Sequence, residues 1–144
     1  MVRFCKIFVI AGLILSSFTT CKKAAGPGGF AQISGKVKVL DYTTNPDTLF
    51  NLGYVFQDEY YIVGKAVYLK YDEEPGVGQS TRTSFDGTYT FEDLRTGKYK
   101  VVVYSRSIDT LTDKNLKYDV FVIKEIEITK RKEQVIVEEI LVLE

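Results

Sequence analysis

The residues from Ser84 to Tyr104, SFDGTYTFEDLRTGKYKVVVY, decide the fold of this chain. The dipeptide Asp86-Gly87 is typical of a tight turn between two β-strands. After this turn, aromatic residues alternate with threonines, which is the period of a strand with one aromatic face. Leu94 stands in a short corner, and Gly97 supplies a second turn before another alternating run. We predict two strands on either side of a corner in which Leu94 and Tyr99 are buried, and one side of the strands carries Tyr89, Phe91, Tyr99, Val101 and Val103.

This stretch resembles the Gly-x-Tyr-x-Phe-x-x-Leu-x-x-Gly-x-Tyr signature of carboxypeptidase regulatory-like domains, also called transthyretin-like or prealbumin-like sandwiches. The matching residues are Gly87, Tyr89, Phe91, Leu94, Gly97 and Tyr99. The opening Ile33-x-Gly35-x-Val37 resembles the first strand of the same family, and the resemblance covers residues 31 to 143. It implies an all-β fold, an antiparallel two-sheet Greek-key sandwich of about seven strands.

Other segments have the composition of strands bounded by turn residues. The predicted strands lie at 31–42, 66–71, 79–85, 117–128 and 133–143. The polar strand 79–85 is expected near a sheet edge, and a phase shift at Glu138-Glu139 predicts a β-bulge. Gly35 is expected at a point where a neighbouring backbone comes close.

The N-terminus resembles a bacterial lipoprotein signal. Arg3 and Lys6 precede an apolar run at 7–18, which has the length of a signal-peptide core and is too short to span a bilayer. Cys21 then ends a Phe-Thr-Thr-Cys segment that is similar to a lipobox, although Phe and Thr replace the usual Leu and small residue. We predict a signal peptide at 1–20, lipidation of Cys21, a flexible tether at 21–30 and one domain at 31–144. A cleaved signal with an unmodified cysteine is the alternative.

Composition argues against several classes of function. Basic and acidic side chains number 19 each, so no net field attracts nucleic acid. The chain contains no histidine, and its two cysteines, Cys5 and Cys21, precede the predicted domain. That domain therefore has no thiol nucleophile, disulfide or Cys/His zinc site. The acidic residues 72–74 and the basic residues 130–132 are expected to be solvated turns. We predict no catalytic residue, no cofactor and no metal.

Residues 43 to 64 depart from the short family pattern. They are too apolar for a plain loop and are expected to add an edge strand, a helical turn or a flap. Tyr54, Tyr60 and Tyr61 form the candidate binding face, because exposed rings can stack on sugars or anchor a protein contact. Packing of these rings in the core is the alternative. One or two tyrosines are expected to stay accessible, while the residues expected to face inward are Leu49, Phe50 and Leu52.

Together these features favour a non-catalytic envelope lipoprotein, in which a regulatory-like sandwich serves as a structural or interaction module. The alternative is a carbohydrate- or peptide-binding accessory lipoprotein that uses the insert 43–64. The expected partners are the membrane, through lipid on Cys21, and an envelope protein or glycan. Lys22-Lys23 lacks the acidic residue that often marks inner-membrane retention, which favours the outer membrane of a Gram-negative bacterium.

Overall fold

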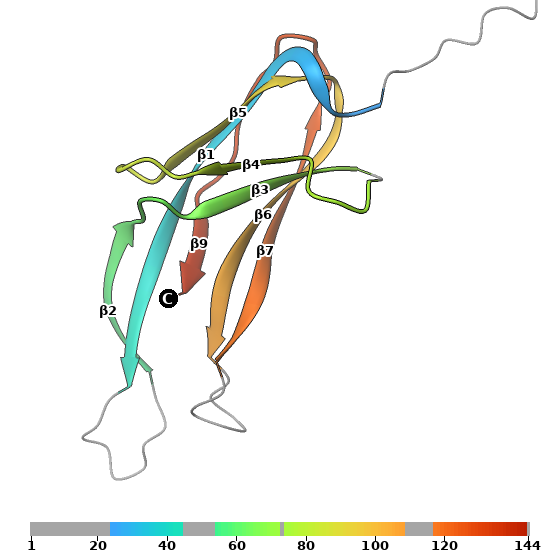
Figure 1. Cartoon of the computed structure of the whole chain (residues 1–144). Coiled ribbons are helices and arrows are strands. Elements are labelled where there is room, and N and C mark those ends of the chain that lie inside the picture. Colours follow the sequence, from blue (N-terminus) through green and yellow to red (C-terminus); the bar gives the residue numbers. More distant parts are fainter. Residues whose placement is uncertain (1–23, 45–53, 73, 109–116, 144) are drawn as a thin grey trace, which may run out of the picture.

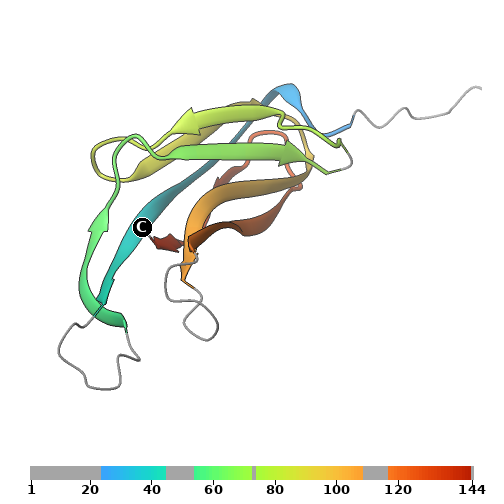
Figure 2. The ribbon, with the colours of Figure 1, turned by 60° about the horizontal axis from the view of Figure 1, so that its bottom comes forward.

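The computed structural model describes residues 24–44, 54–72, 74–108 and 117–143. Their regular structure consists of β-strands in two sheets that form a sandwich (Figures 1 and 2). The predicted all-β two-sheet fold is therefore confirmed, with nine strands in this part of the chain rather than about seven. No helix among the described residues is long and apolar enough to cross a bilayer.

The first sheet is built around one long strand, β1 (Pro27–Thr44). On one side, β5 (Thr88–Leu94) pairs antiparallel with the first half of β1 and β2 (Tyr54–Tyr61) with its second half. On the other side, β8 (Gln134–Ile136) and β9 (Ile140–Leu143) pair parallel to β1. The central strand is thus paired on both sides only in its middle, at 32–34 and 37–40.

The second sheet has four strands in the order β4, β3, β6, β7, and all neighbours are antiparallel. Their bounds are Gln79–Arg82 for β4, Ala66–Tyr71 for β3, Gly97–Ile108 for β6 and Lys117–Ile128 for β7. As predicted, the polar strand β4 lies at a sheet edge, although it ends at Arg82 rather than at 85.

The core lies between the two sheets, where alternate side chains of the strands meet. The residues predicted to share one side of the Ser84–Tyr104 strands are all buried. They pack with the inward residues of the other strands, which include Ile33, Val37, Val39, Val67, Leu69, Ile140 and Val142. Removal of this apolar surface from water is the main favourable term in folding.

Gly35 makes room in β1 for the ring of Tyr89. The two residues are partners across β1 and β5, and a Cβ on Gly35 would come to 2.5 Å from the Tyr89 hydroxyl oxygen. The expected close approach at Gly35 is confirmed, but the approaching group is a side chain rather than a backbone. Tyr89 is 1% exposed, and its hydroxyl has no hydrogen-bond partner within the described residues. Burial raises the pKa of this phenol.

Leu94 and Tyr99 close the corner between β5 and β6, and both are buried as predicted, at 0% and 1% exposure. The Tyr99 hydroxyl donates to the Arg95 carbonyl at 2.7 Å and accepts from the Gly26 N–H at 3.0 Å. A tyrosine that bonds the backbone a few residues upstream is a known way to fasten a sandwich corner. Here the same hydroxyl also holds the segment that leads into β1.

The first strand starts earlier than predicted. β1 begins at Pro27 rather than at 31, so residues 27–30 of the expected flexible tether belong to a strand that pairs with Leu94. The glycines of this segment resemble a linker in sequence, but their small size has a packing reason. A Cβ on Gly29 would lie 1.8 Å from the Leu94 carbonyl oxygen, so no larger residue fits there.

The last strand also differs from its prediction. Residues 133–143 form two short strands, β8 and β9, rather than one strand with a bulge, and both run parallel to β1. The break falls at Val137–Glu139, where Val137 still donates its N–H to Ser34 O at 2.8 Å. The two glutamates lie outside the core: Glu138 contacts Lys124, and Glu139 accepts a hydrogen bond from Tyr61.

Candidate binding surfaces

The structure separates the tyrosines of the predicted binding face. Tyr60 and Tyr61 end β2 and are 44% and 38% exposed. Neighbouring residues of a strand point to opposite sides of the sheet, so these two rings cannot form one face together. Tyr54 pairs with Thr44 at the other end of β2, but its side chain lies outside the described part of the chain, as do Leu49, Phe50 and Leu52.

The ring of Tyr61 is engaged by its own chain. Its hydroxyl donates to Glu139 Oε1 at 2.6 Å, which is the main reason why the pKa of this tyrosine is raised. Lys36 Nζ lies 4.7 Å and Lys38 Nζ 5.4 Å from the ring centroid. Lys38 in turn pairs with Glu59 Oε1 at 2.9 Å. These contacts connect β2, β1 and the segment before β9. Tyr61 is therefore exposed, but its ring and hydroxyl already contact side chains of its own chain.

Of the predicted insert 43–64, the second half therefore forms an edge strand, which is one of the expected forms. Phe56 of this strand is 49% exposed and meets Tyr42 edge-on, with ring centroids 5.7 Å apart. No described contact engages Tyr60 in the way that Glu139 engages Tyr61. A binding role for Tyr60 stays a prediction.

A second group of aromatic rings lies on the outer side of the second sheet, where sequence reasoning did not place a site. Tyr68 in β3 meets Tyr104 in β6 at 5.6 Å between ring centroids, and Tyr104 meets Phe121 in β7 at 4.8 Å. Tyr104 is 42% and Phe121 58% exposed. The register places two apolar residues beside the rings. We call this surface the aromatic face, and it consists of Tyr68, Val102, Tyr104, Phe121 and Ile123.

Charged side chains of both signs surround the aromatic face. Lys100 Nζ pairs with Glu125 Oε1 at 3.0 Å, and Arg106 stands opposite Asp119 in the register of β6 and β7. Along β6 and β7, the apolar centre is therefore bounded at both ends by a polar rim with charges of both signs. This is the usual composition of a protein-binding patch, whereas an ordinary monomer surface scatters its exposed apolar residues singly.

A sequence signal for this face exists in β6 and β7. The runs Val101-Val102-Val103-Tyr104 and Val120-Phe121-Val122-Ile123 are apolar without interruption. Since side chains alternate between faces, an uninterrupted run places apolar residues on both sides of a sheet. The prediction above names only inward residues of β6 and gives only the range of β7, although the same runs also indicate an apolar outer side.

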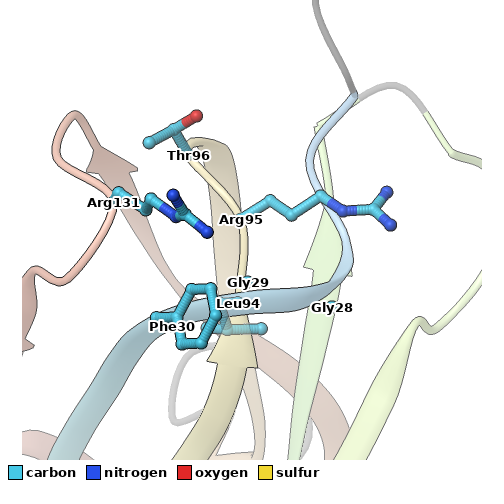
Figure 3. A pocket seen from close by; sticks show the side chains of 7 residues that line it. All are labelled: Gly28, Gly29, Phe30, Leu94, Arg95, Thr96 and Arg131. Carbon is cyan, nitrogen blue, oxygen red and sulfur yellow. The ribbon is translucent and has the colours of Figure 1, made fainter.

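A third surface lies where β1 begins. A hollow of about 410 Å³ is bounded by the start of β1, the corner after β5 and the loop after β7. Its lining residues are Gly28, Gly29, Phe30, Leu94, Arg95, Thr96 and Arg131. Figure 3 shows the Arg131 side chain beside the Phe30 ring, and the distance from the guanidinium carbon to the ring centroid is 4.7 Å.

The basic loop 130–132 beside this hollow is exposed, as predicted. Glu133 holds the loop in shape, because its Oε2 accepts the N–H groups of Thr129 at 2.7 Å and Lys130 at 2.9 Å. These bonds lower the pKa of the Glu133 carboxyl. A larger hollow of about 710 Å³ shares Thr96 with the first, and its lining includes the acids Asp72, Glu74 and Glu127 and the base Lys98.

Among the described residues, no three His, Cys, Asp or Glu side chains are arranged so that they could hold a metal ion. Asp86 has a strongly lowered pKa, caused first by hydrogen bonds from the Ser84 and Thr88 side chains. These bonds belong to the turn before β5, so this carboxylate has a structural explanation. No arrangement of nucleophile and base emerges among the described side chains.

The sequence matches no protein-family model, and comparison with curated proteins gives no match. Among solved structures, the chain is similar to that of a candidate carbohydrate binding protein from Pseudomonas aeruginosa. The TM-score is 0.47 at 14% sequence identity, and the alignment covers 84% of this chain and 92% of the other. A likeness of this degree carries no functional argument.

Proposed function

We propose that this chain is a non-catalytic lipoprotein of the cell envelope whose carboxypeptidase regulatory-like sandwich acts as an interaction module. Two threonines after the end of the apolar signal-like run, the chain reaches Cys21, which supports a lipid anchor. The family assignment is supported by what the signature residues do: Tyr89 packs on Gly35, and Leu94 and Tyr99 close the corner. The sequence after Lys22 contains neither histidine nor cysteine, which supports a role in binding rather than catalysis.

One observation carries the interaction role: the aromatic face leaves a connected row of rings in water. Tyrosine and phenylalanine supply much of the binding energy in protein interfaces, where they lie inside a polar rim. Tyr104 and Phe121 occupy this position, with the Lys100–Glu125 pair on the rim. The proposed partner is an envelope protein with an apolar patch and charges of both signs.

A glycan is the second candidate partner, because an exposed ring can stack on the apolar side of a sugar. The Tyr68–Tyr104 and Tyr104–Phe121 ring planes are inclined by 83° and 55°. Rings at such angles do not make a flat platform, so the geometry suits one stacked sugar rather than a long flat chain. Tyr60 of the insert offers a second exposed ring for this role.

Photo-crosslinking in intact cells tests the proposal. A benzoylphenylalanine residue at position 121 of the full-length chain should give a discrete cross-linked product, whereas the same residue at Phe85, which is 88% exposed on a turn, should not. The product should disappear when Tyr104→Ser is added. Equal labelling at both positions, or none at 121, contradicts a protein-binding aromatic face.

Two further measurements separate the other parts of the proposal. Binding of the purified protein to a glycan array, lost in Phe121→Ser, supports the glycan reading over the protein reading. Cys21→Ala should release the protein from membranes or block its maturation, because stable anchoring needs the acyl chains. Full retention of that variant in the membrane fraction contradicts the lipoprotein reading.

A further inference from the structure

The segment that follows the proposed lipid anchor is fastened to one end of the sandwich. Gly26 donates its N–H to the Tyr99 hydroxyl at 3.0 Å and accepts the Arg95 N–H at 2.9 Å. The neighbouring Ala25 packs so closely on the corner that a Cβ on Gly97 would lie 2.7 Å from its Cβ. The chain is therefore anchored to the corner from residue 25 onward.

This attachment limits how far that end can stand from the lipid. Five peptide units separate Cys21 from Gly26, and an extended chain of that length spans at most about 18 Å. By contrast, strands of twelve residues such as β6 and β7 extend about 40 Å. A lipid on Cys21 must therefore keep the end that carries the corner next to the membrane. The same end carries the loop after β7 (Figure 1).

The chemistry of that end suits a membrane surface. Phe30 is 58% exposed and lies beside Arg131, whereas the Arg95 side chain points away from both of them (Figure 3). No acidic residue lines the Phe30 hollow. Lys130 and Lys132 flank Arg131 in the exposed loop, and the carboxylate of Glu133 is occupied by the loop backbone.

The acidic residues at this end of the sandwich are distributed unequally between the two hollows. Three carboxylates line the larger hollow, and none of them lines the Phe30 hollow; they are Asp72, Glu74 and Glu127. Glu92 and Asp93 are exposed on β5 just before the corner. The Phe30 hollow and the basic loop are thus the part of this end with positive charge and an exposed aromatic ring.

We propose that this surface, formed by Phe30, Lys130, Arg131 and Lys132, docks on anionic lipid headgroups of the membrane that holds Cys21. This inference rests on the proposed lipidation. Guanidinium groups bind phosphate in a bidentate manner, and an aromatic ring lies favourably at the depth of the headgroups. The surface thereby turns a lipid tether into a fixed orientation, with the aromatic face of the second sheet directed along the membrane.

A tryptophan reporter tests this docking, because the chain has no tryptophan of its own. Full-length lipidated Phe30→Trp is reconstituted in phosphatidylcholine vesicles, with and without phosphatidylglycerol, that contain lipid brominated near the headgroup. We expect quenching of the reporter fluorescence in the anionic vesicles, relief of the quenching by salt, and little quenching in the neutral vesicles. Phe85→Trp, on the turn at the other end of β5, should remain unquenched in both.

A charge variant separates docking from mere proximity. Lys130→Gln, Arg131→Gln and Lys132→Gln together, in the Phe30→Trp protein, should lower the ratio of docked to undocked protein on the order of a hundredfold, since each basic residue contributes roughly fivefold. The matched control is Arg106→Gln on β6, which should change nothing. Quenching that is equal with and without anionic lipid, or that survives the triple substitution, overturns the inference.

The failure of this inference can be told apart from failure of the proposed function. Mass spectrometry of the N-terminal peptide reports the lipid on Cys21 directly. If the peptide carries lipid and the tryptophan reporter is not quenched, docking is overturned while the lipoprotein stands. If the peptide carries no lipid, the proposed anchor falls and this inference falls with it.

Discussion

Tyr89 in β5 and Tyr99 at the start of β6 are equally buried, at 1% exposure, yet their hydroxyl groups differ in hydrogen bonding. Tyr99 satisfies its hydroxyl twice with the backbone of the corner. Tyr89 fills the space above Gly35 with its ring, and its hydroxyl finds no partner in the part of the chain that the structure describes. The contact that distinguishes Tyr89 is thus the packing of its ring, whereas the contact that distinguishes Tyr99 is the hydrogen bonding of its hydroxyl. Burial alone does not reveal which part of a side chain stabilises a fold.

The largest effect is expected where the corner itself is emptied. Leu94→Ala removes a fully buried side chain next to Tyr99 and should lower the free energy of unfolding by about 2–5 kcal/mol, through lost apolar transfer and an unfilled cavity. Denaturant unfolding of the purified protein measures it. Leu141→Ala, at a residue 49% exposed on β9, is the control. A loss under about 0.5 kcal/mol, the range of surface changes, would show that the corner is not packed as described.

The next effect isolates the hydroxyl of Tyr99. Tyr99→Phe keeps the ring but leaves the Gly26 N–H and the Arg95 carbonyl without this partner, which should cost about 1–3 kcal/mol. Gly26 should also become more accessible, so proteolysis near residue 25 should accelerate. If Tyr99→Phe left the stability unchanged, the hydroxyl of Tyr99 would contribute no more than that of Tyr89.

Tyr89→Phe, unlike Tyr99→Phe, should not lower the free energy of unfolding appreciably. It deletes a buried hydroxyl that has no described partner, so stability should stay within about 0.5 kcal/mol of the original or increase by about 1 kcal/mol. The ring still fills the space above Gly35. A loss comparable with that of Tyr99→Phe would mean that the Tyr89 hydroxyl does have a partner in solution.

Alkaline pH should sharpen the same contrast. Burial raises the pKa of both phenols, and at Tyr99 the hydrogen bonds with the backbone of Gly26 and Arg95 act against that rise. A phenol with a raised folded pKa stays neutral in the fold while the unfolded chain ionises above its ordinary value of 10.0. Stability is therefore retained below that pH and is lost as the pH rises further. Unfolding midpoints at about pH 8 and about pH 11, on either side of the ordinary value, should differ less for Tyr89→Phe than for the unaltered protein.

The smallest effect is expected at Tyr61, whose hydroxyl bonds an exposed carboxylate. Tyr61→Phe should change the free energy of unfolding by no more than about 0.5 kcal/mol, because an exposed pair contributes little. In the unaltered protein, the Glu139 bond should nevertheless hold the pKa of Tyr61 above its ordinary value of 10.0, which can be followed as the difference in ultraviolet absorbance between the unaltered protein and Tyr61→Phe. Titration of Tyr61 at the ordinary value would show that the Glu139 bond does not persist in solution.

The parts of the fold that the sequence predicts are those with a local pattern. The burial of Leu94 and Tyr99, and the inward side of β5 and β6, follow from alternation and turn residues within one short stretch. Parallel pairing of β8 and β9 with β1 leaves no such pattern, because their partners lie far away in sequence. The glycines at 28 and 29 resemble a linker, but Gly28 adopts a positive φ and Gly29 makes a close contact with the backbone of Leu94, which only the packed corner reveals.

The candidate binding surfaces differ in how well the sequence predicts them, and the reason is the same. Tyr60 and Tyr61 are neighbours in sequence, which suggests a shared face, but the strand points them apart. Tyr104 and Phe121 are distant in sequence and adjacent in space through the register of β6 and β7. A surface made by register needs the pairing of the strands, which composition does not supply.

The central position of β1 has a consequence for how the chain folds. Gln32 pairs with Gln134, and Leu40 pairs with Leu143, so the first strand completes its hydrogen bonds only with the last ones. Contacts between such distant residues make folding slow, because a long loop must close before they form. Until β8 and β9 arrive, one edge of β1 remains an open template for other strands. A chain that is synthesised from its N-terminus therefore depends on its last strands to close that edge, and an incomplete chain that lacks β8 and β9 would leave it exposed.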